Sequence, residues 1–356
     1  MLARCGVGKM EDKFNKAKRQ KAKCTKSLVA YSVMAYALFG FGCEEALQTT
    51  TAEQPEAISV NKLVPEATQI VLQALTDAKP QVRANAIEVV AATRRIKLMP
   101  KVQRLLKDEF VPVRFAASLA VGDLEYSLAE RSVRGLLEDE DENVRIAAAY
   151  ALARLRSVDS FEVFRNSIAS NDQTVRANAA LLLGKSGNQS ELKYLWWTLR
   201  REDSNDKVRF QTAEAIAMLG DARIYPKLWS MLISGYADDR VMGIKGMGVL
   251  GTREAKDALI TMLDDDILEV RLAAAEQLGM LKDTIGEPEV LNVFTRNLTA
   301  DLDKEDLERI NVRTALAIGR IGTRGLTRYL PQLLKDESKL VRIAAAMAVF
   351  QSTLKK

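Results

Sequence analysis

An arginine, usually preceded by valine, recurs along the chain at a nearly constant interval, and this restricts the fold more than any other feature. The interval is 31 residues in most cases, with one of 33 and one of 40, where asparagine stands in place of arginine. Regular spacing at this period is typical of stacked structural repeats, each too small to bury a core alone. With these residues as position zero, the series is Arg83, Arg114, Arg145, Arg176, Arg209, Arg240, Arg271, Asn311 and Arg342.

The residues that follow position zero predict an amphipathic helix in every repeat. Position three is always small and position seven always apolar, while position eight is glycine or alanine in all repeats except the last, which has Phe350. Positions three, four, seven and eight share one face of a helix, and the small residues allow close approach of a neighbour. Six residues before zero most repeats have Asp, which favours a capped turn after an earlier helix. Each repeat is therefore expected to be helix, turn, helix.

This pattern resembles the short HEAT-like repeats first associated with phycobilin lyases. The resemblance covers residues 62–354 and implies an all-α fold, a right-handed α-solenoid of about nine helix-turn-helix repeats. It also implies that the position-zero arginines pair with the turn aspartates of adjacent repeats as a ladder. The repeat serves scaffolds, lyases, DNA-repair enzymes and a hydroxylase, so it indicates fold far more than function.

Composition excludes several classes of site. The chain has no histidine, and its cysteines are Cys5, Cys24 and Cys43. For the chain after Cys43, Cys/His zinc sites, Ser-His-Asp triads and the His-Glu iron site of deoxyhypusine hydroxylase are therefore excluded. Residues 1–26 hold nine of the 52 basic and two of the 47 acidic residues, so the remainder has a net charge of −2 and lacks the cationic excess that nucleic acid needs. We expect no catalytic, metal or cofactor site, and no nucleic-acid partner.

The N-terminal sequence predicts where in the cell the protein is located. Residues 1–42 combine a basic lead with the charge-free segment 27–42, as in an export signal. The end of this segment resembles the lipobox of bacterial lipoprotein precursors, which implies lipidation of Cys43. Residues 43–61 are a polar segment typical of a flexible linker. An uncleaved signal anchor is the alternative, with the same location at the bacterial cell envelope.

A row of apolar side chains is the first candidate binding surface. Position five holds Leu119, Tyr150 and Leu181 in three successive repeats, and Arg154 and Lys185 stand at position nine beside them. An apolar strip with a charged border on the concave face is typical of a binding groove. The alternative is that strong curvature buries these side chains against each other.

Tryptophans define a second candidate surface on the preceding helices. Counting back from the next position zero puts Trp197 among apolar residues, so we expect it in the core. Trp196 and Trp229 fall in mostly polar columns and are predicted to contact a partner, although aromatics that bridge two repeats would give the same pattern. The extra residues of the 40-residue interval are expected in a solvated acidic loop within 299–311.

These observations favour a non-catalytic protein-binding scaffold or adaptor, displayed on an envelope membrane and binding through its concave face. The main alternative is a templating enzyme of the chromophore-lyase type built on the same repeats. The predicted partner is a protein, with membrane attachment through the lipidated N-terminus.

Overall fold

A computed structural model describes residues 59–157 and 161–354. The chain divides into two units, 1–51 and 52–356, and all described residues belong to the second. The predicted export signal, Cys43 and most of the linker lie outside the described residues. The described part contains helices and no strands. None of its helices combines the length and the apolar character that a membrane span requires.

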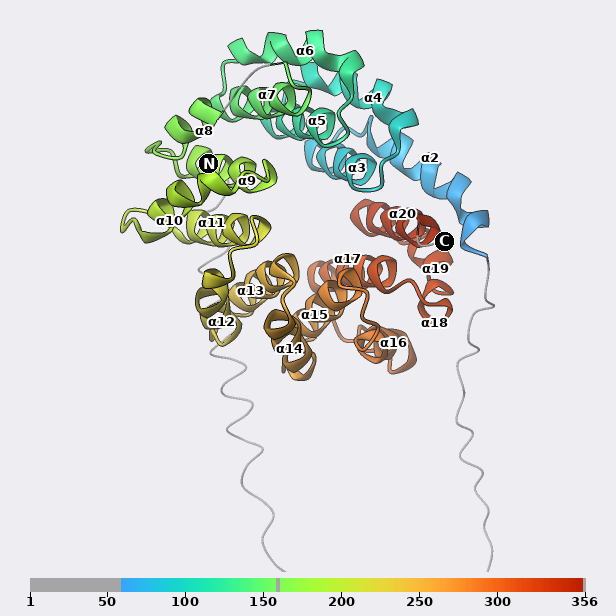
Figure 1. Cartoon of the computed structure of the whole chain (residues 1–356). Coiled ribbons are helices and arrows are strands. Elements are labelled where there is room, and N and C mark those ends of the chain that lie inside the picture. The colour runs from blue at the N-terminus through green and yellow to red at the C-terminus, as the bar shows by residue number, and fades with distance from the viewer. Residues whose placement is uncertain (1–58, 158–160, 355–356) are drawn as a thin grey trace, which may run out of the picture. The chain divides into compact units, whose positions relative to one another are not determined.

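Helices in the described residues form nine repeats, each with one inner and one outer member, and this confirms the all-α solenoid (Figure 1). The inner helices carry position zero: α3 (Pro80–Ala92), α5 (Val111–Asp123), α7 (Glu142–Arg154), α9 (Gln173–Lys185), α11 (Asp206–Met218), α13 (Ala237–Leu250), α15 (Leu268–Met280), α17 (Lys304–Ile321) and α20 (Lys339–Leu354). The outer helices are α2 (Val64–Ala74), α4 (Met99–Arg104), α6 (Glu130–Gly135), α8 (Phe161–Ser167), α10 (Leu192–Arg200), α12 (Tyr225–Leu232), α14 (Arg253–Thr261), α16 (Glu287–Thr295) and the pair α18 (Arg324–Thr327) and α19 (Leu330–Leu333). Short 3₁₀ turns flank many of them: η1 (Val60–Leu63), η2 (Ile96–Leu98), η3 (Leu105–Lys107), η4 (Ser127–Ala129), η5 (Leu136–Glu138), η6 (Gln189–Glu191), η7 (Ala222–Ile224) and η8 (Met262–Asp264).

The expected arginine ladder joins most neighbouring repeats; among the described residues it is interrupted after Arg145 and Arg209, where serine stands at the next turn in place of aspartate. Arg83 Nη2 lies 2.7 Å from Asp108 Oδ1, and Arg114 Nε lies 2.9 Å from Asp139 Oδ2, one repeat further on. These two arginines also donate to the carbonyl oxygen of the turn residue in their own repeat, Arg83 to Asp77 and Arg114 to Asp108. The ladder satisfies nearly buried guanidinium groups, whose charge would be costly to bury without a partner.

Small residues at position eight set the close packing of the inner helices. A Cβ added to Gly184 on α9 would lie 2.7 Å from Ala215 Cα on α11, and one added to Gly319 on α17 would lie 2.7 Å from Ala348 Cα on α20. The position-seven side chains beside this seam are fully buried, as at Leu152 and Leu183. The predicted stripe is thus the core of the solenoid.

The last repeat packs against the first, so the solenoid of the described unit closes on itself (Figure 1). Helix α20 lies against α17 on one side and against α2 and α3 on the other. Phe350, the exception at position eight, is fully buried, and the Arg95 guanidinium lies 3.9 Å from its ring centroid. At the rim of the closure, Lys339 Nζ lies 2.5 Å from Asp77 Oδ2. The described repeats therefore form a ring.

The 40-residue interval lengthens a helix as well as a loop. Helix α17 has 18 residues where most inner helices have 13, and Asp303 at its N-cap accepts from the backbone amides of Glu305 and Asp306. The ladder adapts here, because Arg271 Nε lies 2.9 Å from Glu289 Oε2 on α16 instead of reaching the turn that follows. Asn311 keeps its place in the ladder by donating to Asp336 Oδ2 over 3.1 Å.

Candidate functional site

The predicted apolar row does not form an exposed groove, because Tyr150 is buried with only 3% of its surface exposed. Its hydroxyl donates to Asp123 Oδ1 over 2.7 Å, and its ring packs onto Gly122 of the preceding repeat. Leu119 and Leu181 are partly buried. The expectation that Tyr150 is an exposed contact residue is therefore wrong.

Curvature of the ring explains this burial. Lys185 Nζ lies 3.0 Å from Asp123 Oδ2, although the two residues are two repeats apart, so the intervening Tyr150 is covered from above. Arg154 Nη2 is also engaged, 2.7 Å from Glu125 Oε1. Burial, followed by the Asp123 carboxylate, raises the pKa of the Tyr150 phenol well above its ordinary 10.0. The predicted charged border of a groove is instead part of the packing between inner helices.

The tryptophans are arranged differently from the sequence-based expectation. Trp197 is 48% exposed, and Leu195 occupies the buried position that had been assigned to Trp197. The two extra residues of the 33-residue interval lie after α10, in the turn before α11. Counting back from Arg209 crosses these two residues and therefore assigns each residue of α10 to a column two positions away from its true one. Counted forward from Arg176 instead, Trp196 and Trp229 share one column on neighbouring outer helices, with Trp196 partly buried and Trp229 38% exposed.

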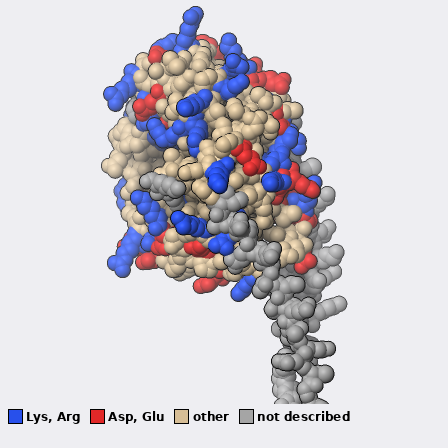
Figure 2. All heavy atoms as spheres, turned by 90° about the vertical axis from the view of Figure 1, so that its right-hand side faces the viewer, with Lys and Arg blue, Asp and Glu red and all other residues tan. Residues whose placement is uncertain are grey.

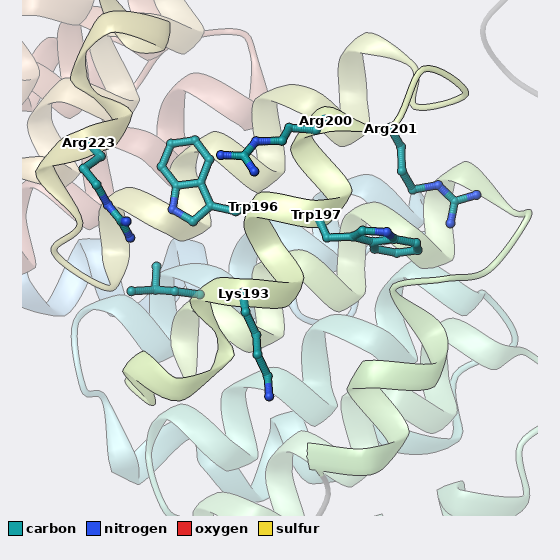
Figure 3. A pocket seen from close by; sticks show the side chains of 7 residues that line it. Lys193, Trp196, Trp197, Arg200, Arg201 and Arg223 are labelled. Carbon is teal, nitrogen blue, oxygen red and sulfur yellow. The ribbon is translucent and has the colours of Figure 1, made fainter.

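Helix α10 lies on the outer side of the ring (Figure 1). An open depression of about 820 Å³ lies along it, and Figure 3 shows the side chains that line it. Its two tryptophans and four cationic side chains are labelled in Figure 3. We call this set the α10 cluster: Leu192, Lys193, Trp196, Trp197, Arg200, Arg201 and Arg223.

Fixed contacts hold the aromatic floor of the α10 cluster. The indole N–H of Trp196 donates to Asp221 Oδ2 over 2.9 Å, and the guanidinium carbons of Arg200 and Arg223 lie 5.5 and 5.7 Å from its ring. The Arg201 guanidinium carbon lies 4.7 Å from the Trp197 ring. These are cation–π distances, so the rings and cations orient one another before any ligand binds.

Two of the cations already have carboxylate partners, and two do not. Arg223 holds Asp221, with help from the Trp196 indole, and Arg201 and Arg176 hold Asp203; these contacts lower the pKa of both carboxyls well below their usual range. Within the described residues, Lys193 and Arg200 are exposed and make cation–π contacts but no ion pair. The α10 cluster therefore offers uncompensated positive charge beside an exposed indole.

The chemistry of the α10 cluster is that of binding. Its side chains can stack on apolar or planar groups and donate to carboxylates or other anions. Among the described residues, no group of three potential ligands could hold a metal ion. On the face seen in Figure 2, cations and anions are interspersed.

The repeat pattern indicated Trp196 and Trp229 but not the cations around them. The signal was present in residues 193–201, where lysine and two arginines flank the tryptophan pair at helical spacing. Recognising these residues as one surface required knowing which side of α10 faces the core.

Comparisons with known proteins support the HEAT-like repeat. A sequence family described as HEAT repeats matches residues 225–310. No curated protein sequence matches the chain.

Several solved structures resemble the chain loosely. Human deoxyhypusine hydroxylase in complex with glycerol is 15% identical, covering 83% of this chain and 99% of that one, with a TM-score of 0.35. The CpcE–CpcF complex of phycocyanin lyase from Nostoc sp. is 18% identical, covering 85% and 98%, with a TM-score of 0.32. Kap121p bound to Pho4p is 15% identical, covering 79% and 37%, with a TM-score of 0.33.

Proposed function

We propose that this protein is a non-catalytic protein-binding scaffold, carried on an envelope membrane through a lipidated Cys43. The observation that supports this function best is the α10 cluster, an exposed group of indoles and cations on the outer side of the ring. Tryptophan and arginine are the residues most enriched among those that dominate protein interfaces.

Folding does not account for the exposed part of the α10 cluster. Leu195 fills the core position of α10, while Trp197 remains 48% exposed on the opposite side of the helix. Arg200 and Lys193 likewise contribute no ion pair within the described chain. An exposed apolar surface with a polar rim is typical of protein interfaces. We therefore assign partner binding to the outer helices and not to the concave row.

Site-specific photocrosslinking tests this function. A benzoylphenylalanine at position 197, introduced into the full chain in its native cells, is expected to capture one discrete protein partner. The same probe at position 104 is the control, because the exposed Arg104 occupies on the second repeat the column that Trp197 occupies on the fifth. Equal capture at both positions, or none at 197, would refute the proposed surface.

A further inference from the structure

We infer that the α10 cluster binds an extended acidic peptide in the polyproline II conformation, with two carboxylates three residues apart around an apolar side chain. This inference deepens the proposed function by stating the chemistry of the partner, and it depends on that function. Three features of the α10 cluster carry it: the spacing of its free cations, its rigid aromatic floor and its local charge.

The spacing of the two cations without ion-pair partners indicates the peptide conformation and the carboxylate spacing that would fit. Lys193 and Arg200 are seven residues apart on α10, and two helical turns separate them by about 10.5 Å along the axis. In polyproline II, residues three apart lie on the same side of the chain, separated by about 9.3 Å. Two carboxylates at positions i and i+3 can therefore face both cations at once, with the flexible lysine and arginine side chains absorbing the small difference.

The aromatic floor between the cations suits such a chain. Trp196 and Trp197 lie on α10 between Lys193 and Arg200, and the Trp196 ring is fixed by Asp221, Arg200 and Arg223. Aromatic-lined grooves recognise polyproline II segments because neither side loses much conformational freedom on binding. An apolar residue or proline between the two carboxylates would rest on these indoles.

Local charge favours a short peptide over a long polyanion or a membrane. The chain after residue 26 has a net charge of −2, so the α10 cluster is not part of an overall cationic excess. Nucleic acid binding needs a longer cationic track. Insertion into a bilayer needs tryptophans that are free to move into the interface, whereas the Trp196 indole already donates to Asp221 and carries two guanidinium groups.

The test is fluorescence anisotropy with the full chain and the fluorescein-labelled peptide Ala-Glu-Leu-Pro-Glu-Ala. The chain has the same spacing at Glu53 and Glu56, so both are changed to glutamine in every sample to remove internal competition. We expect saturable binding that weakens with added salt. A peptide with glutamine at both acidic positions, and one with the two glutamates adjacent, should each bind at least tenfold more weakly.

Matched variants locate the binding. Lys193→Gln and Arg200→Gln should each raise the Kd about fivefold, the upper range for an exposed ion pair. Trp197→Ala should raise it tenfold or more, as expected when an aromatic anchor is removed. Lys107→Gln removes an exposed cation from the column of Arg200 in another repeat and should leave the Kd unchanged. Thermal melts verify that each variant is folded.

Several outcomes would overturn the inference. Equal binding of the glutamine peptide would show that charge does not select the ligand, and equal loss with Lys107→Gln would place the site elsewhere. Absent peptide binding, with capture of phosphatidylserine vesicles that Arg200→Gln abolishes, would identify a membrane surface instead. If position 197 crosslinks to a protein but no acidic peptide binds, this inference alone fails; if it crosslinks to nothing, the proposed function fails too.

Discussion

At the scale of single residues, Tyr150 shows how a neighbour's size decides burial. Its ring occupies space that exists only because residue 122 is glycine, where an added Cβ would lie 2.8 Å from Tyr150 Cε1. The buried hydroxyl is satisfied by Asp123, and Lys185 lies above the ring with its Nζ 5.9 Å from the centroid. Tyr150 therefore belongs to the core and not to a binding row.

We predict that Tyr150→Ala destabilises the fold by about 3–5 kcal/mol, the usual cost of removing a buried aromatic ring. Tyr150→Phe keeps the ring and should cost only about 1 kcal/mol for the lost hydrogen bond. Urea unfolding followed by circular dichroism measures both. If Tyr150→Ala unfolds at the wild-type midpoint, the side chain contributes nothing to the core.

Alkaline titration is a second readout for the same residue. Burial and then Asp123 raise the folded-state pKa of Tyr150 above its unfolded value near 10, so its contribution to stability is complete below about pH 10. That contribution is lost as pH rises further, because only the unfolded state releases the proton easily. Tyr150→Phe should show a smaller loss of stability between pH 10 and pH 11 than the wild type.

At the scale of elements, the position-eight column explains how neighbouring inner helices approach. Glycine or alanine at this position lets backbone meet backbone, as between Gly184 and Ala215. By contrast, Gly135 ends the outer helix α6 with ordinary helical angles and has no atom within 4 Å of an added Cβ. The two glycines therefore have opposite energetic roles.

We predict opposite effects for the same substitution at these two glycines. Gly184→Ala should destabilise the protein by about 1–3 kcal/mol, because the α9–α11 seam must open. Gly135→Ala should stabilise it by about 0.5–1 kcal/mol, because it restricts the unfolded chain without strain. Chemical denaturation of the pair checks the seam, and a stabilising Gly184→Ala would contradict it.

At the scale of the whole described unit, closure removes the exposed ends that a linear solenoid must protect. Terminal repeats of open arrays carry a polar outer face, yet α20 is apolar on both sides, with Ile343, Ala346 and Phe350 all buried. Its second side is covered by α2 and α3. The first and last repeats therefore stabilise each other.

We predict that Phe350→Ala destabilises both ends of the array together, by about 3–5 kcal/mol. Hydrogen exchange should show lost protection in α2 and α3 as well as in α20, since the packing is reciprocal. Leu354→Ala is the control, because this residue of the same helix is 61% exposed and should change little. Loss confined to α20 would indicate a frayed end and not a closed ring.

Membrane attachment through Cys43 can be tested directly. If Cys43 is the lipidated residue, Cys43→Ser should abolish acylation and move the protein from the detergent phase to the aqueous phase of a Triton X-114 partition. Metabolic labelling with a palmitate analogue measures acylation directly. Unchanged membrane attachment of the variant would favour an uncleaved anchor.

Features that depend on residues at constant separation follow directly from the amino-acid sequence. The helix pair and the small-residue seam recur with the 31-residue period, so the period is enough to reveal them, whereas the Arg–Asp ladder was expected from the resemblance to HEAT-like repeats. Their physical basis is local, because each of these contacts lies within one repeat or between two adjacent repeats.

Closure of the ring and burial of side chains by its curvature depend on the three-dimensional arrangement of all the repeats. Small rotations between repeats add up over the whole array, and no single repeat encodes their sum. The summed rotation places Lys185 over the ring of Tyr150, and it places Arg95, which follows α3, over the ring of Phe350. Likewise, the sequence showed that two residues were added between Arg176 and Arg209, but only the backbone showed that they follow α10 and leave Trp197 exposed.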